Sequence, residues 1–303
     1  MPAQPLDLDG LLIIDKPAGW TSHDVVGRLR RLTGIRRIGH AGTLDPLATG
    51  VLPMGIGRGT RVLEYVSDAE KQYAGTLVLG AVTDTYDSDG RMLEQRDWSR
   101  VSEVMARRTF AEFLGTIEQH PPIYSAIKQG GVPLHRLARA GKAVAPPSRT
   151  VTIREVEVTE VDLPRVSFRV TCTKGTYIRS LAHDLGQRLG CGAHLIALRR
   201  TMTGGFTLCQ AVTIENFERA LNDGSWPARV LPVDQPLIDR PALILDERAS
   251  ERLQFGVAPD APAPTTGEGT RARVYAFDGT FLGVICWRGT HERWRVEKIL
   301  QGR

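Results

Sequence analysis

The stretch Gly39-His-Ala-Gly-Thr-Leu-Asp-Pro-Leu-Ala-Thr-Gly-Val-Leu52 contains a single carboxylate, that of Asp45. Asp45 is also the only acidic residue between Val25 and Leu63. The same span holds seven arginines: Arg28, Arg30, Arg31, Arg36, Arg37, Arg58 and Arg61. The seven arginines and Asp45 together give the span a net charge of 7 − 1 = +6. A surface of this charge attracts phosphates and binds polyanions in a salt-dependent way. The sequence therefore places one anion inside a phosphate-attracting field.

An Asp-Pro pair after a glycine-rich loop also has an ordinary structural interpretation. Asp45 would be the N-cap of a helix, and Pro46 would be its first helical residue. For an isolated Asp-Pro pair this is the expected arrangement. The choice between a helix start and a reactive loop depends on the longer motifs described below.

Size and composition indicate a folded protein of ordinary globular type. The chain has 303 residues (33.3 kDa), of which 42% are hydrophobic and 24% charged, and this length suffices for one large and one small domain. Lys and Arg exceed Asp and Glu by 39 − 34 = 5. This balance points only weakly to nucleic acid, and the clustering of the charges is more informative.

Cysteine usage and the N-terminus bear on the compartment. Four widely spaced cysteines (Cys172, Cys191, Cys209 and Cys286) form no CxxC pair, which argues against zinc and against a disulfide framework. The first residues lack a basic segment followed by an apolar one, and no apolar run approaches the ~18 residues of a membrane span. We therefore expect a cytoplasmic protein with no metal and no membrane association.

Hydrophobic periodicity predicts the order of the elements. Strands are expected at Gly10–Asp15, Val51–Ile56, Gln72–Leu79, Val151–Val161, Arg165–Thr173, Arg271–Phe277, Phe281–Trp287 and Arg293–Ile299. Helices are expected to start at Thr60, Ser102, Thr176 and Asp246, and Ser22 is expected to be the N-cap of a further helix. Tyr73 falls on the buried face of its strand, with a polar tip. In the helix that starts at Ser102, residues Val104, Met105 and Ala111 should face the core. Tyr177 and Arg179 fall in the first turn of the helix near residue 176.

The stretch Asp84-Thr-Tyr-Asp-Ser-Asp-Gly90 is acidic enough to suggest calcium binding. Aligning Gly90 with the sixth position of an EF-hand loop places Arg96 at position twelve, where a bidentate carboxylate is required. We therefore interpret this stretch as a turn.

The segment from Gln119 to Arg149 contains no acidic residue. Its five positive charges are those of Lys128, Arg136, Arg139, Lys142 and Arg149. Glycines and prolines interrupt the segment, and such a composition is typical of a basic loop that becomes ordered on a polyanion. The alternative is an ordinary solvated insertion. Further on, four prolines between residues 227 and 241 predict a boundary before the β-rich C-terminus.

Six motifs follow one another along the chain: DKPAGWTS from Asp15, GHAGTLDPLATGVLP from Gly39, KQYAGTLVLG from Lys71, HPPIYSAIKQGG from His120, KGTYIRSLAHDLG from Lys174 and AHLIALRR from Ala193. In sequence and in order they resemble the motifs of the TruB family of tRNA pseudouridine synthases. The resemblance implies an α+β fold with a mixed, largely antiparallel central sheet flanked by helices. It also implies a catalytic domain at residues 1–239 with a basic RNA-binding insertion at about 124–150, and a PUA-like RNA-binding domain at 240–303.

The resemblance also implies roles for individual residues. Asp45 would be the nucleophile, Tyr73 the ring that packs on the target base, and Arg179 the partner of the aspartate. The substrate-binding residues would be His40, Tyr177, Leu198 and Lys16, with His40 filling the gap left by the flipped base and Lys16 contacting either the RNA or the scaffold. In the basic insertion Lys128, Arg136, Arg139 and Lys142 would bind RNA. The family commonly has Tyr where Leu134-His135-Arg136 stands, which leaves the contact of His135 open.

The chemistry that the resemblance implies agrees with these residue types. Converting uridine to pseudouridine breaks an N–C bond and makes a C–C bond without redox change, so no cofactor is expected. A bidentate guanidinium would keep the nucleophilic carboxylate ionised. An apolar, aromatic pocket would receive the base after it leaves the stack. The sequence leaves open whether Asp45 attacks ribose C1′, attacks uracil C6 or acts through a glycal route.

Three functions remain to be compared. The first is a stand-alone synthase, expected to be a monomer with no obligatory protein partner, that modifies the T-loop uridine (nucleotide 55) in the T-arm of tRNA. The second is a related synthase that needs a guide RNA and protein partners, and the basic insertion after Tyr124 favours the stand-alone type. The third is a non-catalytic RNA-binding protein, for which a carboxylate in a basic groove would bring no benefit.

Overall fold

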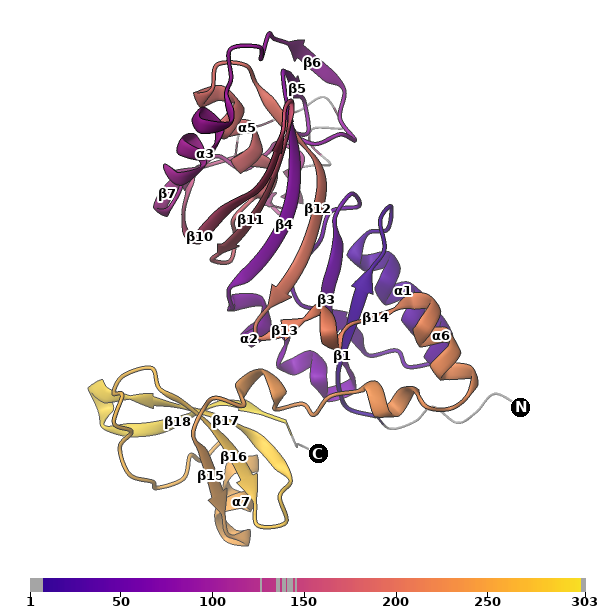
Figure 1. The fold of residues 1–303 in the computed structure, drawn as a ribbon. Helices are drawn as coiled ribbons and strands as arrows, with labels where there is room; N and C mark the ends of the chain where they lie inside the picture. Colours follow the sequence, from indigo (N-terminus) through magenta and orange to yellow (C-terminus); the bar gives the residue numbers. More distant parts are fainter. Residues whose placement is uncertain are drawn as a thin grey trace.

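The computed structural model describes residues 8–125, 127–134, 137, 140, 144 and 146–300. Within these residues, a ten-stranded sheet forms the centre of the molecule and a four-stranded sheet lies at one end (Figure 1). The large sheet comprises β1 (Gly10–Lys16), β2 (Ile38–His40), β3 (Thr49–Ile56), β4 (Lys71–Leu79), β7 (Gly115–Gln119), β10 (Arg149–Asp162), β11 (Arg165–Cys172), β12 (Ala193–Thr203), β13 (Phe206–Thr207) and β14 (Val212–Thr213). The small sheet comprises β15 (Ala242–Leu245), β16 (Arg271–Ala276), β17 (Phe281–Arg288) and β18 (Arg293–Ile299).

The remaining elements are two short hairpins and the helices. One hairpin pairs β5 (Ala81–Thr83) with β6 (Met92–Gln95), and the other pairs β8 (Lys128–Gln129) with β9 (Val132–Pro133). The α-helices are α1 (Ser22–Thr33), α2 (Leu63–Asp68), α3 (Glu103–Ala111), α5 (Ile178–Arg188), α6 (Ile214–Asn222) and α7 (Glu247–Gln254). The 3₁₀ helices are η1 (Gly57–Arg61), η2 (Leu208–Gln210), η3 (Trp226–Arg229), η4 (Gln235–Leu237) and η5 (Gly289–His291).

The large sheet is mixed and mostly antiparallel. Its strand order is β14-β1-β3-β12-β4-β11-β10-β7, with β2 beside β3 and β13 beside β12. Two neighbouring pairs, β1 with β14 and β3 with β12, run parallel. This confirms the predicted α+β class with a largely antiparallel central sheet. The predicted pairing of the strands near residues 151–161 and 165–173 is confirmed as β10 and β11.

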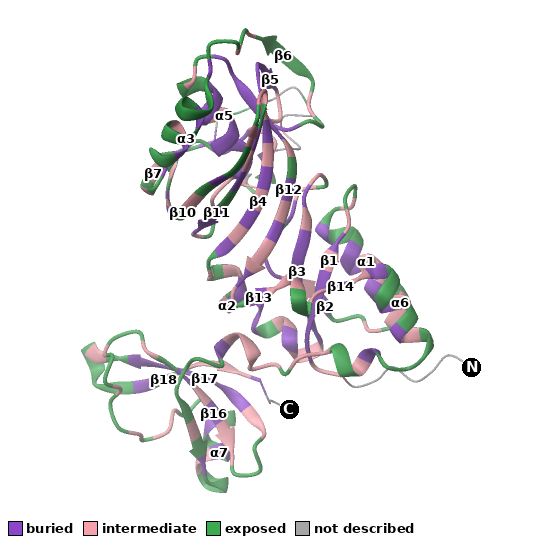
Figure 2. Ribbon diagram, in the orientation of Figure 1, coloured by how far each residue is buried: buried purple, intermediate pink, exposed green. Residues whose placement is uncertain are grey.

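Helices cover the two halves of the sheet separately (Figure 1). Near β1, helix α6 packs against α1, and in the other half α3 packs against α5 and β10. Figure 2 shows buried and partly exposed residues alternating along β4, as the period-2 pattern predicts. Tyr73 lies on the buried face of β4 and retains 7% of its exposure.

Two local predictions were wrong. The N-cap of α1 is Thr21, which forms a capping box with Asp24, and Ser22 is the first helical residue. In α3 the buried side chains are Ala106 and Phe110, whereas Val104, Met105 and Ala111 are exposed. The buried pair has i, i+4 spacing on one side of the helix, and the sequence alone does not say which side faces the sheet.

The small sheet packs with α7 and contacts the large unit through η1 and α2. Leu300 joins a buried cluster that contains Leu63, and Arg61 donates a hydrogen bond to the Ile299 carbonyl at 2.7 Å. Lys298 forms an ion pair with Glu64 of α2. The three predicted C-terminal strands are confirmed as β16, β17 and β18. Strand β15, which pairs in parallel with β16, was not predicted.

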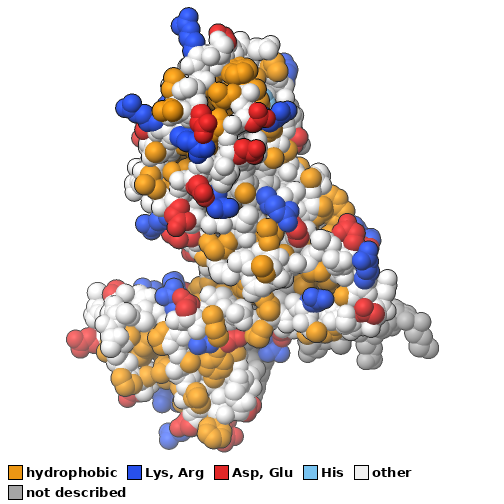
Figure 3. Space-filling model, viewed as in Figure 1, with side chains coloured by type: hydrophobic (Ala, Val, Ile, Leu, Met, Phe, Trp, Pro, Cys, Tyr) orange, Lys and Arg blue, Asp and Glu red, His pale blue; other side chains and the backbone are white. Residues whose placement is uncertain are grey.

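The described surface gives two further observations. On the face shown in Figure 3, acidic and basic side chains lie among one another, so charge on that face is mixed. None of the helices among the described residues is long and apolar enough to cross a membrane.

Helix η1 packs so closely on β1 that position 59 has no room for a side chain. A Cβ atom on Gly59 would lie 1.9 Å from the backbone oxygen of Gly10. We therefore expect Gly59→Ala to lower the free energy of unfolding by at least about 1–3 kcal/mol, measured by urea denaturation. In the interior of α1, a Cβ on Gly27 would meet only the Arg31 guanidinium at 3.6 Å. Gly27→Ala is the matched control and should raise stability by about 0.5–1 kcal/mol. Equal effects of the two changes would contradict the close approach.

Candidate active site

The candidate site lies where strands β3 and β12 meet. These strands pair at Thr49 with Arg199 and at Gly50 with Arg200. A Cβ on Gly50 would lie 2.2 Å from the Arg200 carbonyl oxygen, so this approach requires glycine. Beside the junction is a cavity of about 230 Å³. It is lined by Gly42, Thr43, Leu44, Asp45, Ala48, Ser67, Lys71, Tyr73, Lys174, Gly175, Thr176, Tyr177, Ile178, Arg179, Leu198 and Arg200.

Asp45 lies in a turn and does not start a helix. The Ala48 amide donates to the Asp45 carbonyl at 3.0 Å, and the chain continues directly into β3. The helix-cap interpretation of Asp45 and Pro46 is therefore wrong. The Asp45 side chain is 40% exposed, and its carboxylate forms an ion pair with Arg179 at 2.9 Å. A carboxylate in this position is both fixed and accessible to a ligand.

Arg179, in the first turn of α5, is shared between two carboxylates. Its Nη2 contacts Asp45 Oδ2 at 2.9 Å, and its Nη1 contacts Asp87 Oδ2 at 3.3 Å. The same two nitrogens donate to the carbonyls of Tyr124 at 3.1 Å and Thr85 at 3.0 Å. The expected bidentate pair with Asp45 is therefore wrong, because the second amino group is directed at Asp87 and Thr85. The side chain of Arg179 is 7% exposed, and a buried cation requires such neutralisation.

Asp87 is the functional candidate that the sequence reasoning missed. It is 4% exposed and lies in the turn that was predicted for residues 84–90. Its Oδ1 accepts hydrogen bonds from Thr85 Oγ1 at 2.5 Å and from the Asp89 amide at 3.1 Å. The predicted turn is confirmed, but nothing local in the sequence links Asp87 to an arginine on a distant helix.

Tyr73 and Arg200 face one another across β4 and β12. They are register partners, and Arg200 is fully buried. Burial raises the pKa of Tyr73, although the Arg200 guanidinium acts in the opposite direction. Arg200 donates to the carbonyls of Val51 at 2.7 Å and Gly42 at 2.9 Å, which fixes the loop that carries Asp45. The sequence contains one signal for a role of Arg200 in the site. Arg200 follows Leu198 by two residues on one strand, so the two side chains share a face.

Two lysines near the site are buried and bonded to carbonyls. Lys71 Nζ donates to the carbonyls of Ser67 at 2.8 Å and Ala69 at 2.6 Å, and Lys71 lines the cavity. Lys16 is 0% exposed, and its ammonium donates to carbonyls that include Pro46 O. Burial lowers the pKa of each lysine from 10.5 to about 8. Lys16 thus supports the loop from behind, which favours the scaffold contact over an RNA contact.

The other predicted residues differ in their relation to the cavity. Tyr177 and Leu198 line it, together with Asp45, Tyr73 and Arg179. His40 is not among its lining residues; it ends β2, and its ring lies 5.5 Å from that of His23. Burial, aided by His23 and Arg200, lowers the pKa of His40 to about 4, so its ring is uncharged at neutral pH.

Most of the residues of the basic insertion that are predicted to contact RNA lie outside the described part of the chain. Arg136, Arg139, Lys142 and His135 lie outside the described residues, and for Lys128 only the backbone, in β8, is described. Their phosphate contacts stay predictions. Within the described ranges, no group of three or more His, Cys, Asp and Glu side chains is placed to hold a metal ion.

Comparisons with known proteins identify the family. The family described as "TruB family pseudouridylate synthase (N terminal domain)" matches residues 30–178, and "tRNA pseudouridylate synthase B C-terminal domain" matches residues 179–238. A Burkholderia pseudomallei protein named tRNA pseudouridine synthase B is 45% identical over 281 residues, covering 91% of this chain and 92% of the relative. One of the same name from Geobacter sulfurreducens is 41% identical, covering 87% and 86%.

Solved structures show the same fold. A Cbf5-Nop10-Gar1 complex contains a chain that aligns with a TM-score of 0.74 and 26% identity, covering 97% of this chain and 85% of that one. An archaeal box H/ACA sRNP Nop10-Cbf5 complex gives a TM-score of 0.73 and 27% identity, covering 97% and 86%. The fold and the matched families define an enzyme of the pseudouridine synthase class. Within that class, the chain belongs to the TruB family.

The first prediction from the site concerns Asp87. Asp87→Asn keeps the shape of the side chain but removes the charge that faces Arg179 Nη1. We expect the single-turnover rate of pseudouridine formation to fall about 100-fold. The guanidinium loses one of its two carboxylate partners and therefore shifts relative to Asp45. The matched control is Asp89→Asn, an exposed carboxylate in the same turn. Equal rates for the two variants would contradict the role of Asp87.

A second prediction concerns stability and pH. Between about pH 8 and 10.5 the unfolded chain retains the Lys71 proton that the folded protein has lost, so Lys71 makes stability rise with pH in this window. Below it both states are protonated, and this contribution is constant. We therefore expect the free energy of unfolding of the wild type, minus that of Lys71→Met, to rise with pH above about 8. Both free energies are measured by urea denaturation. Lys174→Met, at an exposed lysine of the same cavity, is the control. A difference that is independent of pH would contradict the burial of the Lys71 charge.

Proposed function

We propose that this protein isomerises the uridine at nucleotide 55, in the T-loop of tRNA, to pseudouridine, with Asp45 as the nucleophile. The observation that carries the proposal is the Asp45 carboxylate, 40% exposed at a cavity and paired at 2.9 Å with a buried arginine. Both curated relatives described above are tRNA pseudouridine synthases by name, which supports tRNA as the substrate.

The reaction requires the glycosidic bond to break and a carbon bond to form at the same ribose. The bond from uracil N1 to ribose C1′ is lost, C5 bonds to C1′, the C5 proton leaves to solvent and N1 gains a proton. The routes through C1′, C6 or a glycal share one need, a carboxylate that is ionised when the base arrives. The ion pair with Arg179 at 2.9 Å holds this carboxylate at the cavity.

The cavity would hold the target base after it leaves the RNA stack. Tyr73 and Leu198 provide aromatic and apolar surface, and both are nearly buried. Because burial raises the Tyr73 pKa, its hydroxyl keeps its proton near neutral pH and serves as a hydrogen-bond donor beside the base. Enclosure would also keep the detached uracil close to C1′ until C5 bonds.

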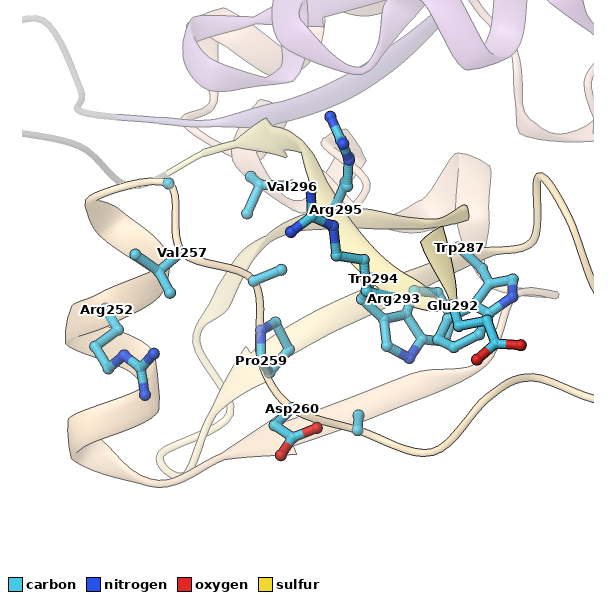
Figure 4. Close-up of a pocket in the computed structure, with 13 residues that line it drawn as sticks. Arg252, Val257, Pro259, Asp260, Trp287, Glu292, Arg293, Trp294, Arg295 and Val296 are labelled. Atoms are coloured by element: carbon cyan, nitrogen blue, oxygen red, sulfur yellow. The ribbon is translucent and has the colours of Figure 1, made fainter. Parts of the chain in front are cut away.

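The C-terminal unit provides a second surface that suits RNA. A cavity of about 610 Å³ lies between β18 and the loop after α7 (Figure 4). Arg252, Arg293 and Arg295 line it, and the rings of Trp287 and Trp294 lie 5.4 Å apart beside them. Guanidinium groups bind the phosphates of nucleic acid without reading sequence, whereas the two tryptophan rings are buried and belong to the core of this unit. This arrangement supports residues 240–303 as a PUA-like RNA-binding domain.

A guide-dependent synthase and a passive RNA binder are the competing functions. The guide-dependent type requires further components, whereas the proposed enzyme should modify a tRNA transcript alone. A passive binder would gain nothing from a carboxylate in a phosphate-binding surface. One assay, with purified protein and transcript only, separates the proposed enzyme from both alternatives, because neither of them would form pseudouridine under these conditions.

Asp45→Asn tests the proposed function. We expect this change to abolish release of tritium from [5-³H]uridine-labelled tRNA, because the amide cannot act as nucleophile. The affinity for tRNA, measured by filter binding at fixed salt, should stay within a few-fold of wild type, since removal of a negative charge does not weaken phosphate contacts.

The matched control is Asp162→Asn, an exposed carboxylate at the end of β10. It should release tritium at the wild-type rate. More than a few per cent of wild-type activity in Asp45→Asn would remove Asp45 from the chemistry. No release by wild-type protein without guide RNA would exclude the stand-alone reaction.

A further inference from the structure

Tyr86 has a backbone conformation that its side chain disfavours. Its φ is +63°, and among the described residues it shares the left-handed region with just one other non-glycine residue, Glu292. Asn and Asp tolerate this region because their short side chains bond the local backbone, but a tyrosine gains no such compensation. A residue of this kind keeps its conformation only where the surrounding structure imposes it, and such positions concentrate at functional sites.

Three contacts fix Tyr86. Its amide donates a hydrogen bond to the Thr83 carbonyl at 3.3 Å. Its ring stacks on the ring of His183, with centroids 3.9 Å apart and planes inclined by 16°. Its carbonyl accepts a hydrogen bond from the Leu195 amide at 3.0 Å. Burial lowers the pKa of His183, which favours the neutral form of the stacked imidazole. The stack joins the turn at residues 84–90 to helix α5.

The neighbours of Tyr86 are the groups that hold Arg179. The Thr85 carbonyl accepts from Arg179 Nη1 at 3.0 Å, and the Asp87 carboxylate lies 3.3 Å from the same nitrogen. The left-handed residue between them turns the chain so that both groups face α5. His183 follows Arg179 by four residues on α5, so the stack and the guanidinium occupy one side of the helix.

We propose that the stack of Tyr86 on His183 is a positioning element for the Arg179 guanidinium, and through it for the Asp45 carboxylate. This inference rests on the proposed function of Asp45. Neither ring lines the cavity, so both residues act through Arg179 and not on the substrate. The stack holds the turn in the one conformation that directs Thr85 O and Asp87 Oδ2 at the same nitrogen.

Substitutions at both rings test the stack. Tyr86→Ala and His183→Ala should each lower the single-turnover rate at saturating tRNA about ten-fold or more, with little change in tRNA affinity. Tyr86→Phe and His183→Phe keep a stacked pair and should retain the wild-type rate. His183→Phe also removes a ring nitrogen, Nδ1, that is buried without a hydrogen-bond partner. Tyr86→Gly adopts the left-handed conformation freely but has no ring, and it should be slow like the alanine variant.

A general loss of stability must be separated from loss of positioning. Phe217→Leu, in the buried core of α6, is the matched control: it should lower the Tm without lowering the rate below the transition. The double variant Tyr86→Ala/Asp87→Asn should be no slower than Asp87→Asn alone, because both changes act on the same guanidinium. NMR resonances of the Arg179 guanidinium should shift in Tyr86→Ala and stay in place in Tyr86→Phe.

Several outcomes would overturn the positioning role. These are a wild-type rate in Tyr86→Ala or Tyr86→Gly, rate losses that simply add in the double variant, an equal rate loss in Phe217→Leu, or unmoved Arg179 resonances in Tyr86→Ala. The guanidinium resonances report on positioning whether or not tRNA is modified. If wild-type protein forms no pseudouridine while these resonances move as expected, the proposed function fails and the positioning contact stands. If wild-type protein is active and the resonances do not move, only the positioning role fails.

Discussion

The structure depends on one buried cation with two anionic partners. The side chain of Arg179 is almost fully buried, and a buried guanidinium needs acidic partners where it lies. Asp87 is a buried partner, whereas Asp45 is a partner that is open to ligand. This difference between the two carboxylates has a chemical consequence. A guanidinium already held by Asp87 and by two carbonyls can stay in place when Asp45 engages a substrate.

The loop that carries Asp45 is fixed from several sides by buried polar groups. Arg200 bonds the Gly42 carbonyl, Ser22 accepts from the Leu44 amide at 2.9 Å, and Lys16 reaches the Pro46 carbonyl at 3.4 Å. Each of these side chains comes from a different element of the fold: β12, α1 and β1. As the proposed nucleophile, a carboxylate held in this way would need little rearrangement before reacting, which is how electrostatic preorganisation lowers a barrier. The position of the proposed nucleophile is thus specified by the tertiary structure, although the stretch that carries it is contiguous in sequence.

Much of this arrangement could be predicted from the sequence because the signals are local. Period-2 alternation identified the strand of Tyr73 and its buried face, and the helical spacing near residue 176 placed Arg179 in a first turn. What could not be predicted were contacts between distant segments. Asp87 and Arg179 come together only because the turn after β5 packs on α5, and the sheet register that sets Arg200 opposite Tyr73 is equally non-local. The exposed side of α3 was mistaken for the buried one because both sides carry apolar residues.

The central claim, that this site converts one particular uridine, is tested most directly by mapping the product. Purified protein would be incubated with an unmodified tRNA transcript, without guide RNA, and pseudouridine would be located by carbodiimide labelling and primer extension. The account predicts a single new stop, which reports pseudouridine at nucleotide 55 of the T-loop. Absence of any stop, or stops of equal strength at uridines outside the T-loop, would contradict it.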